Sequence, residues 1–115
     1  MITLYGIPNC DTVKKARTWL EKHNQDYVFF DVRKDVITSS IIECWCERSD
    51  WQMLVNKRST TWKQLDEQQR QNLSRENVAT LLADNPTLIK RPVLDHDNGL
   101  EVGFNDSIYQ TIFSA

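Results

Sequence analysis

The sequence has few of the residues that interrupt regular secondary structure, with 3 glycines and 3 prolines among 115 residues. It has no apolar run near the ~18 residues that a membrane-spanning helix needs, and it begins without the pattern of an export signal. Neither sign of charge is in large excess, since the formal net charge is −2. This excludes a strongly basic surface for direct contact with nucleic acid or a membrane. We therefore expect a cytoplasmic, monomeric protein with a single domain over residues 1–115.

Cysteine is also scarce, with 3 residues, Cys10, Cys44 and Cys46. An odd number in a chain without an export signal predicts free thiols rather than disulfides. The histidines, His23 and His96, do not lie at metal-ligand spacing from each other or from any cysteine, so we expect no metal site and no tightly bound cofactor. We expect one or both of Cys44 and Cys46 to pack as small apolar residues in a helix, and the sequence leaves their reactivity open.

Cys10 stands in a different context from the other two cysteines. It lies between a short apolar run at residues 2–5 and a segment with apolar residues at helical spacing over 13–20. Asn9 can cap the first turn of that helix. A helix N-terminus offers unpaired N–H groups and the positive end of the helix dipole, which stabilise a thiolate and can hold the anion that it attacks. The sequence therefore predicts a nucleophilic thiol at Cys10.

The other elements follow from apolar patterning and turn residues. Asp97-Asn98-Gly99 is a good hairpin turn, and the spacing Thr61-x-x-Gln64 has the form of a capping box. Ser74 is the expected cap of the next helix, which Asn85-Pro86 ends. The sequence predicts strands at 2–5, 27–32, 91–95 and 100–104, and helices from about 11, from 38 or 39 to about 50, at 62–69, at 74–85, and after a cap at 105 or 106 with Ile108, Ile112 and Phe113 inward.

This order predicts an α/β fold. A parallel strand pair followed by an antiparallel hairpin gives a four-stranded mixed sheet flanked by helices, with a helical insertion at about 38–85 between the βαβ and ββα units. This is the thioredoxin-like plan. Two features favour it: Cys10 at the start of the first helix, and Pro92 at the start of the third strand, where a cis bond would bring backbone close to that cysteine.

Four segments, at 6–16, 56–62, 86–94 and 102–104, resemble the ArsC/Spx family, and most closely its YffB-like branch of small bacterial proteins. The resemblance covers essentially the whole chain and implies a thioredoxin-like fold with a helical insertion. For ArsC members it implies reduction of arsenate with glutathione and glutaredoxin. For Spx members it implies a redox-sensing regulator that binds the RNA polymerase alpha subunit. For the YffB-like branch it implies a glutathione-dependent thiol reductase.

The resemblance also implies roles for individual residues. Cys10 matches the family's nucleophile, and Pro92 matches a proline expected to be cis. Arg58 and Arg91 match arginines that surround the oxyanion in ArsC, a role that suits guanidinium because it binds planar anions bidentately and never loses its charge. The candidate anion contacts are Arg58, Arg91, Lys14, Asn9 and Thr12.

Several positions depart from the family pattern. Gly6 stands where ArsC has a histidine, and Gly103-Phe104-Asn105 occupies the region of a third arginine, which disfavours arsenate reduction. Lys14 replaces another arginine and keeps the charge without the fork. Val13 stands where Spx has a second cysteine, so an internal Cys-x-x-Cys disulfide cannot form. Any disulfide step then needs an outside thiol, for which glutathione is the natural candidate.

Together these observations predict a glutathione-dependent monothiol oxidoreductase in which Cys10 forms a covalent adduct that glutathione resolves. Glutathione is then a cosubstrate, and glutaredoxin is a candidate partner. The first alternative is an Spx-like regulator that binds the RNA polymerase alpha subunit. The second is an arsenate reductase that uses glutathione and glutaredoxin.

Overall fold

The structure is a computed structural model that describes residues 2–114. The chain divides into two compact units, one formed by the residues up to Asp31 together with those from Arg91 onward, and one formed by Val32–Lys90. Among the described residues, no helix combines the length and the apolar character needed to cross a membrane. That the two units make one domain, with an insertion at about 38–85, stays a prediction.

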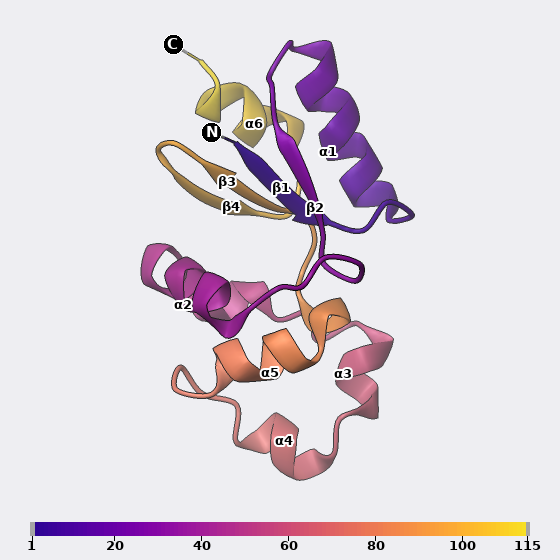
Figure 1. The fold of residues 1–115 in the computed structure, drawn as a ribbon, viewed down its shortest axis with the longest axis vertical. Helices are drawn as coiled ribbons and strands as arrows, with labels where there is room; N and C mark the ends of the chain where they lie inside the picture. The colour runs from indigo at the N-terminus through magenta and orange to yellow at the C-terminus, as the bar shows by residue number, and fades with distance from the viewer. Residues whose placement is uncertain (1, 115) are drawn as a thin grey trace. The chain divides into compact units, whose positions relative to one another are not determined.

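The first unit contains a four-stranded sheet in the order β2-β1-β3-β4, drawn in Figure 1. β1 runs parallel to β2 and antiparallel to β3, which pairs with β4 as a hairpin. The thioredoxin-like mixed sheet is thus confirmed. The strands are β1 (Thr3–Gly6), β2 (Val28–Asp31), β3 (Val93–His96) and β4 (Gly99–Val102).

Helix α1 (Asp11–Lys22) supplies much of the core of this unit. Its buried residues are those expected at helical spacing, with Trp19 added to them. The predicted cap was wrong, because the N-cap residue is Cys10 and not Asn9. The Cys10 carbonyl accepts the first helical hydrogen bond from the Lys14 N–H at 2.9 Å. The helix therefore begins at the candidate nucleophile itself.

Helix α6 (Asp106–Ile112) packs in the same unit. Asn105 caps it as predicted, since its side-chain oxygen accepts the Ile108 N–H at 3.2 Å. Ile108 was expected to face inward, which was wrong, because its side chain is 40% exposed. Tyr109 is buried instead, with its ring edge-on to that of Trp19 at 5.5 Å. An aromatic residue thus takes the core position expected of an isoleucine.

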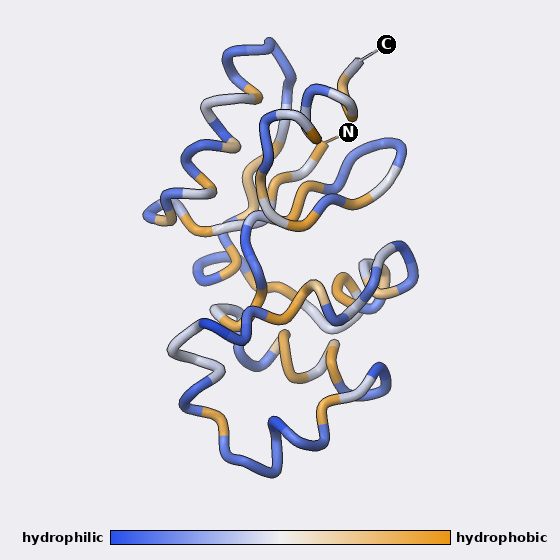
Figure 2. Tube along the Cα trace, turned by 180° about the vertical axis from the view of Figure 1, so that it is seen from behind, coloured by the Kyte–Doolittle hydropathy of each residue, from blue (hydrophilic) through white to orange (hydrophobic). Residues whose placement is uncertain are grey.

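The second unit is helical, and Figure 2 shows apolar and polar residues alternating along its helices. Thr38 caps its first helix as predicted by accepting the Ile41 N–H at 3.3 Å. The fully buried residues Ile42, Trp45 and Leu82 come from the two helices that pack together, α2 and α5. The elements are α2 (Ser39–Arg48), η1 (Trp51–Leu54), α3 (Thr60–Gln64), α4 (Glu67–Gln71), α5 (Val78–Asp84) and η2 (Pro86–Leu88).

The helix predicted at 62–69 is wrong in its extent and its cap. The chain becomes extended at Leu65, which is buried, and this separates α3 from α4. The capping box is formed by Asp66 and Gln69, whose side chains accept each other's backbone N–H. The Thr61 hydroxyl is hydrogen-bonded to Thr87 at 2.6 Å. Ser59 rather than Thr61 caps α3, since its hydroxyl oxygen accepts the Trp62 N–H at 3.1 Å.

The start of α5 also differs from the prediction. Ser74 does not cap it, since the helix begins at Val78 after Asn77. The Asn77 side-chain oxygen accepts the Ser74 N–H at 2.9 Å, which forms a turn ahead of the helix. The predicted end at Asn85-Pro86 is confirmed.

A side chain at Gly6 would disrupt the contact between β1 and α1. A Cβ added there would lie 2.7 Å from Cγ2 of Val13, which is fully buried. We expect Gly6→Ala to lower the free energy of unfolding by about 1–3 kcal/mol through overpacking. In urea denaturation the double variant Gly6→Ala/Val13→Ala should be more stable than the sum of the two single changes implies.

Gly99→Ala is the matched control for that series. A Cβ at Gly99 would lie 3.6 Å from the nearest atom of His96, an ordinary contact distance. Its denaturation midpoint should stay close to that of the wild type. A Gly6→Ala protein with the wild-type midpoint would show that β1 and α1 are not closely packed at this position.

The Tyr109 hydroxyl is buried and has no hydrogen-bond partner within residues 2–114. Burial raises the pKa of Tyr109 far above its usual value. We expect Tyr109→Phe to raise the free energy of unfolding by about 1 kcal/mol, because it removes a buried, unsatisfied polar group. Calorimetry should show a higher Tm.

Tyr27→Phe should have the opposite effect on Tm. The Tyr27 hydroxyl accepts from Arg17 Nε at 3.0 Å and donates to Glu21 at 2.8 Å. Its removal should lower the free energy of unfolding by about 0.5–1.5 kcal/mol. A fall in Tm for both variants would mean that the Tyr109 hydroxyl is satisfied in solution.

Candidate functional site

Cys10 occupies the N-cap of α1 with an extended backbone, at φ −94° and ψ 125°. It is partly exposed, and its own N–H donates to the Ile7 carbonyl at 3.3 Å. The Cys10 side chain forms no capping hydrogen bond with this end of the helix. The first-turn N–H groups of an α-helix lack helical acceptors, and such groups can bind an anion.

The cis proline lies at the same end of the sheet as the loop that leads to Cys10. Tyr5 pairs with Val93 in the antiparallel β1–β3 ladder, so the end of β1 and the start of β3 adjoin. The Arg91–Pro92 peptide bond is cis, as the resemblance implied. Gly103 lies at φ +88°, and its N–H donates to the Pro92 carbonyl at 2.8 Å. The end of β4 is thereby joined to this end of the sheet as well.

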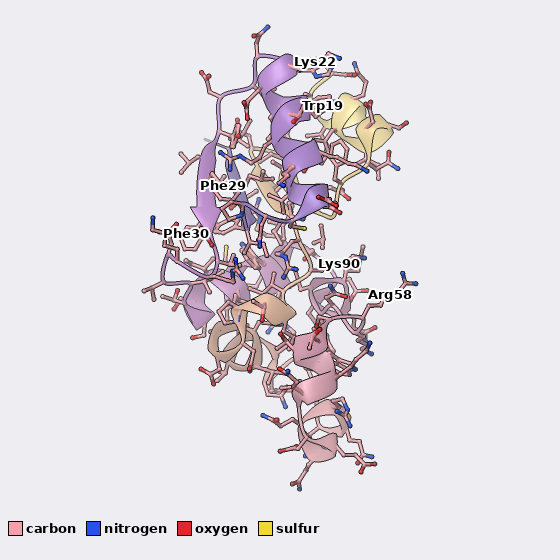
Figure 3. All side chains as sticks on the ribbon, turned by 90° about the vertical axis from the view of Figure 1, so that its right-hand side faces the viewer. Trp19, Lys22, Phe29, Phe30, Arg58 and Lys90 are labelled. Carbon is pink, nitrogen blue, oxygen red and sulfur yellow. The ribbon has the colours of Figure 1, made fainter. Side chains whose placement is uncertain are left out.

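The other candidate anion contacts fall in both units. In the first unit, Arg91 and Thr12 are half-buried, whereas Lys14 and Asn9 are exposed. In the second unit, Arg58 lies in the turn before α3, and its N–H donates to the Asn56 side-chain oxygen at 3.0 Å. Figure 3 shows the Arg58 side chain extending away from α3. The anion-binding roles of all five residues stay predictions.

Two departures from the family pattern are in direct contact. Gly6 stands at the histidine position of ArsC and Val13 at the second cysteine position of Spx, and their atoms approach too closely to admit a Cβ on Gly6. Val13 is fully buried. A side chain at position 6 would therefore require a smaller residue or a different packing at position 13.

A groove beside α1 was missed by the sequence reasoning. Its volume is about 390 Å³, and all its lining residues belong to the first unit. The spacing of Lys14, Thr18 and Lys22 along one helix face is a signal that could have pointed to it. The other side of the groove is formed by Phe104 and Asp106, near the end of the chain, and the spacing of residues within α1 does not predict their position. The lining residues are Lys14, Lys15, Thr18, Trp19, Lys22, His23, Phe104 and Asp106.

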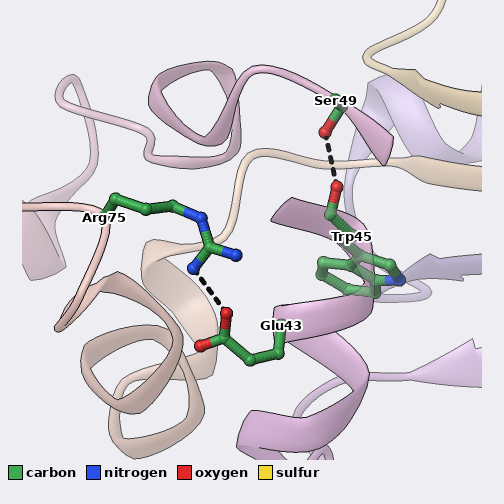
Figure 4. Close-up of polar contacts among 4 residues, drawn as sticks. All are labelled: Glu43, Trp45, Ser49 and Arg75. Carbon is green, nitrogen blue, oxygen red and sulfur yellow. Dashed lines mark hydrogen bonds and ion pairs between the residues drawn. The ribbon is translucent and has the colours of Figure 1, made fainter. Parts of the chain in front are cut away.

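The two cysteines of α2 differ in environment. Cys46 is buried, which confirms the expected packing for that residue, whereas Cys44 is exposed. Burial raises the pKa of the Cys46 thiol, an effect that the nearby Arg75 opposes. Arg75 is paired with Glu43, and the Ser49 hydroxyl donates to the Trp45 carbonyl at 2.9 Å one turn further on (Figure 4). Cys46 is therefore a poor nucleophile.

Residues 2–114 contain no cluster of side chains suited to a metal ion.

Comparison with known proteins links the chain to one family. The ArsC family profile matches residues 5–112. The chain is 46% identical to an uncharacterised protein of Haemophilus influenzae, over 99% of this chain and 100% of the relative. It is 30% identical to the global transcriptional regulator Spx 1 of Oceanobacillus iheyensis, over 92% of this chain and 82% of the regulator.

A solved structure shows the same likeness. The protein named YffB superposes with a TM-score of 0.93 at 38% identity, covering 99% of this chain and 100% of its own. The family profile extends from within the first strand to the last helix. The chain therefore belongs to the ArsC family.

Proposed function

We propose that this protein is a glutathione-dependent monothiol oxidoreductase with Cys10 as its nucleophile. The observation that carries the proposal is the position of Cys10, which is partly exposed at the N-cap of α1 and whose side chain forms no capping hydrogen bond there. A thiolate and the anion that it attacks are both stabilised at such a position. Membership of the ArsC family supports thiol chemistry at this cysteine.

The proposed reaction is an exchange of disulfides. The Cys10 thiolate attacks the glutathione sulfur of a mixed disulfide, a bond forms between Cys10 and glutathione, and the substrate leaves as a thiolate. A second glutathione thiolate then attacks the glutathione sulfur of the adduct, which releases Cys10 as a thiolate and forms oxidised glutathione. The substrate is reduced by two electrons, and glutathione is oxidised by two.

Binding of glutathione is assigned to the helix N-terminus and to the two arginines. Glutathione carries carboxylates, which first-turn N–H groups and guanidinium groups bind by charge-assisted hydrogen bonds. Arg91 precedes the cis proline at the end of the sheet that carries the loop to Cys10. Arg58 is included because it matches the family's second oxyanion arginine. Val13 in place of a second cysteine makes glutathione, rather than the protein, the resolving thiol.

Incubation with oxidised glutathione should add one glutathionyl group to the peptide that contains Cys10. Peptide mass spectrometry should find this group in the wild type and in Cys44→Ser, and no group in Cys10→Ser. Cys46 should stay unmodified because it is buried. Modification of Cys44 with Cys10 untouched would contradict the proposal.

Replacement of either arginine should weaken the use of glutathione. We expect Arg58→Ala and Arg91→Ala to lower kcat/KM for glutathione by roughly 10- to 100-fold, chiefly through KM, because each removes a charge-assisted contact. The lysine variants should recover only part of the loss, since lysine lacks the bidentate fork. Lys63→Ala, which removes an exposed charge from α3, is the control. If Arg58→Ala behaves like Lys63→Ala, Arg58 does not belong to the site.

A second candidate function is that of an Spx-like regulator. It is favoured by the similarity over 92% of this chain to a protein named as a global transcriptional regulator. A pull-down with the RNA polymerase alpha subunit separates the two functions. Capture by wild type and Cys10→Ser alike would favour docking, whereas no capture together with glutathione turnover would favour chemistry.

Arsenate reduction with glutathione and glutaredoxin is the less favoured alternative. ArsC has a histidine at the position of Gly6, and here the packing of Val13 leaves no room for a side chain there. Turnover of arsenate in the presence of glutathione and glutaredoxin would favour this alternative.

A further inference from the structure

The groove beside α1 in the first unit is basic, although the chain as a whole carries a net charge of −2. Lys14, Lys15 and Lys22 line it, and all three side chains are exposed. None of the three forms an ion pair with a carboxylate of residues 2–114. Asp106 is the one carboxylate in the lining. Three lysines and one aspartate leave the lining with a net positive charge, which favours an acidic occupant.

The groove also has an aromatic wall held in place by packing. Trp19 is 5% exposed and stacks on His23, with ring centroids 3.9 Å apart and planes inclined by 15°. Phe104 is half-buried against Tyr109, with ring centroids 4.8 Å apart. Figure 3 labels Trp19 and Lys22 on α1. Rigid aromatic rings beside lysines suit an apolar side chain that has acidic neighbours.

The groove begins one helical turn from Cys10. The Lys14 N–H donates to the Cys10 carbonyl, so the two residues are successive along the axis of α1. A rise of ~1.5 Å per residue places Lys14 about 6 Å and Lys22 about 18 Å beyond Cys10 along that axis. An extended peptide covers this distance in about 2 to 6 residues at ~3.3 Å each. A substrate that reacts at Cys10 can therefore place its neighbouring residues in the groove.

We propose that the substrates are protein cysteines in mixed disulfide with glutathione, flanked within about six residues by acidic and apolar side chains. This rests on the proposed function and names its substrate class. The groove binds the protein segment, and Cys10 forms its disulfide with the glutathione sulfur. The protein cysteine leaves as a thiolate, and a second glutathione thiolate restores Cys10 and forms oxidised glutathione.

The test uses three substrates, each a mixed disulfide with glutathione. The first is a synthetic octapeptide with one cysteine, two glutamates and a phenylalanine, and in the second the glutamates are lysines. The third is the mixed disulfide of 2-mercaptoethanol, which cannot reach the groove. For the wild type, the KM of the acidic peptide should be about tenfold below that of the lysine peptide, as two weak surface charge contacts allow.

Charge reversal in the groove should remove this preference. Lys15→Glu/Lys22→Glu should raise the KM of the acidic peptide about tenfold with kcat unchanged, and should leave the 2-mercaptoethanol substrate unaffected. Lys63→Glu/Lys90→Glu, which reverses two exposed charges in the other unit, should keep the wild-type preference. Equal KM values for the two peptides in the wild type would overturn the inference about the groove.

A binding measurement separates this inference from the proposed function. A fluorescein-labelled acidic peptide with serine in place of cysteine should bind the wild type in fluorescence anisotropy and lose that binding in Lys15→Glu/Lys22→Glu. If none of the three disulfides is reduced, the proposed function fails. In that case the anisotropy measurement alone tests the inference about the groove. Equal binding of the acidic peptide to the wild type and to Lys15→Glu/Lys22→Glu would overturn that inference.

Discussion

The close contact between Gly6 and Val13 is the constraint on which the first unit depends. Gly6, the last residue of β1, lies so close to Val13 in the first turn of α1 that the space beside its Cα can hold only a hydrogen atom. A strand and a helix that touch so closely leave little freedom to the short loop between them. The loop ends at Cys10, which becomes the N-cap of α1. The packing of two small hydrocarbon surfaces therefore decides where the thiol is placed.

The same contact links two chemical properties of the site. A glycine at position 6 leaves no histidine near the start of the loop, and a buried valine at position 13 leaves no second thiol on the helix. Neither residue can be changed to a larger one without disturbing the other. A site built in this way depends on an outside thiol, so the monothiol character that we propose is a consequence of core packing as much as of chemistry.

Helix α1 serves the core and the site at once. Its inner face buries Ala16 and Leu20 against the sheet, and its N-terminus offers amide groups beside Cys10. Its exposed lysines and Phe104 line the same groove, which has a volume of about 390 Å³. A rigid helix of three turns thus carries the nucleophile and the residues that we assign to substrate selection, so both keep a fixed spacing along one axis.

Local patterns were enough to predict the order of the strands along the chain, the buried face of α1, the hairpin of β3 and β4, and the position of Cys10 at the start of a helix. Each of these depends on residues close together in the chain. Local patterns could not show that Ser59 caps α3 in place of Thr61, or that a separate helix begins after Asp66. The extended backbone at the buried Leu65 separates these two helices. Nor could local patterns show that Tyr109 rather than Ile108 enters the core, or that Lys14 and Phe104 line one groove. Such contacts join residues far apart in sequence, and only the packing of the folded chain brings them together.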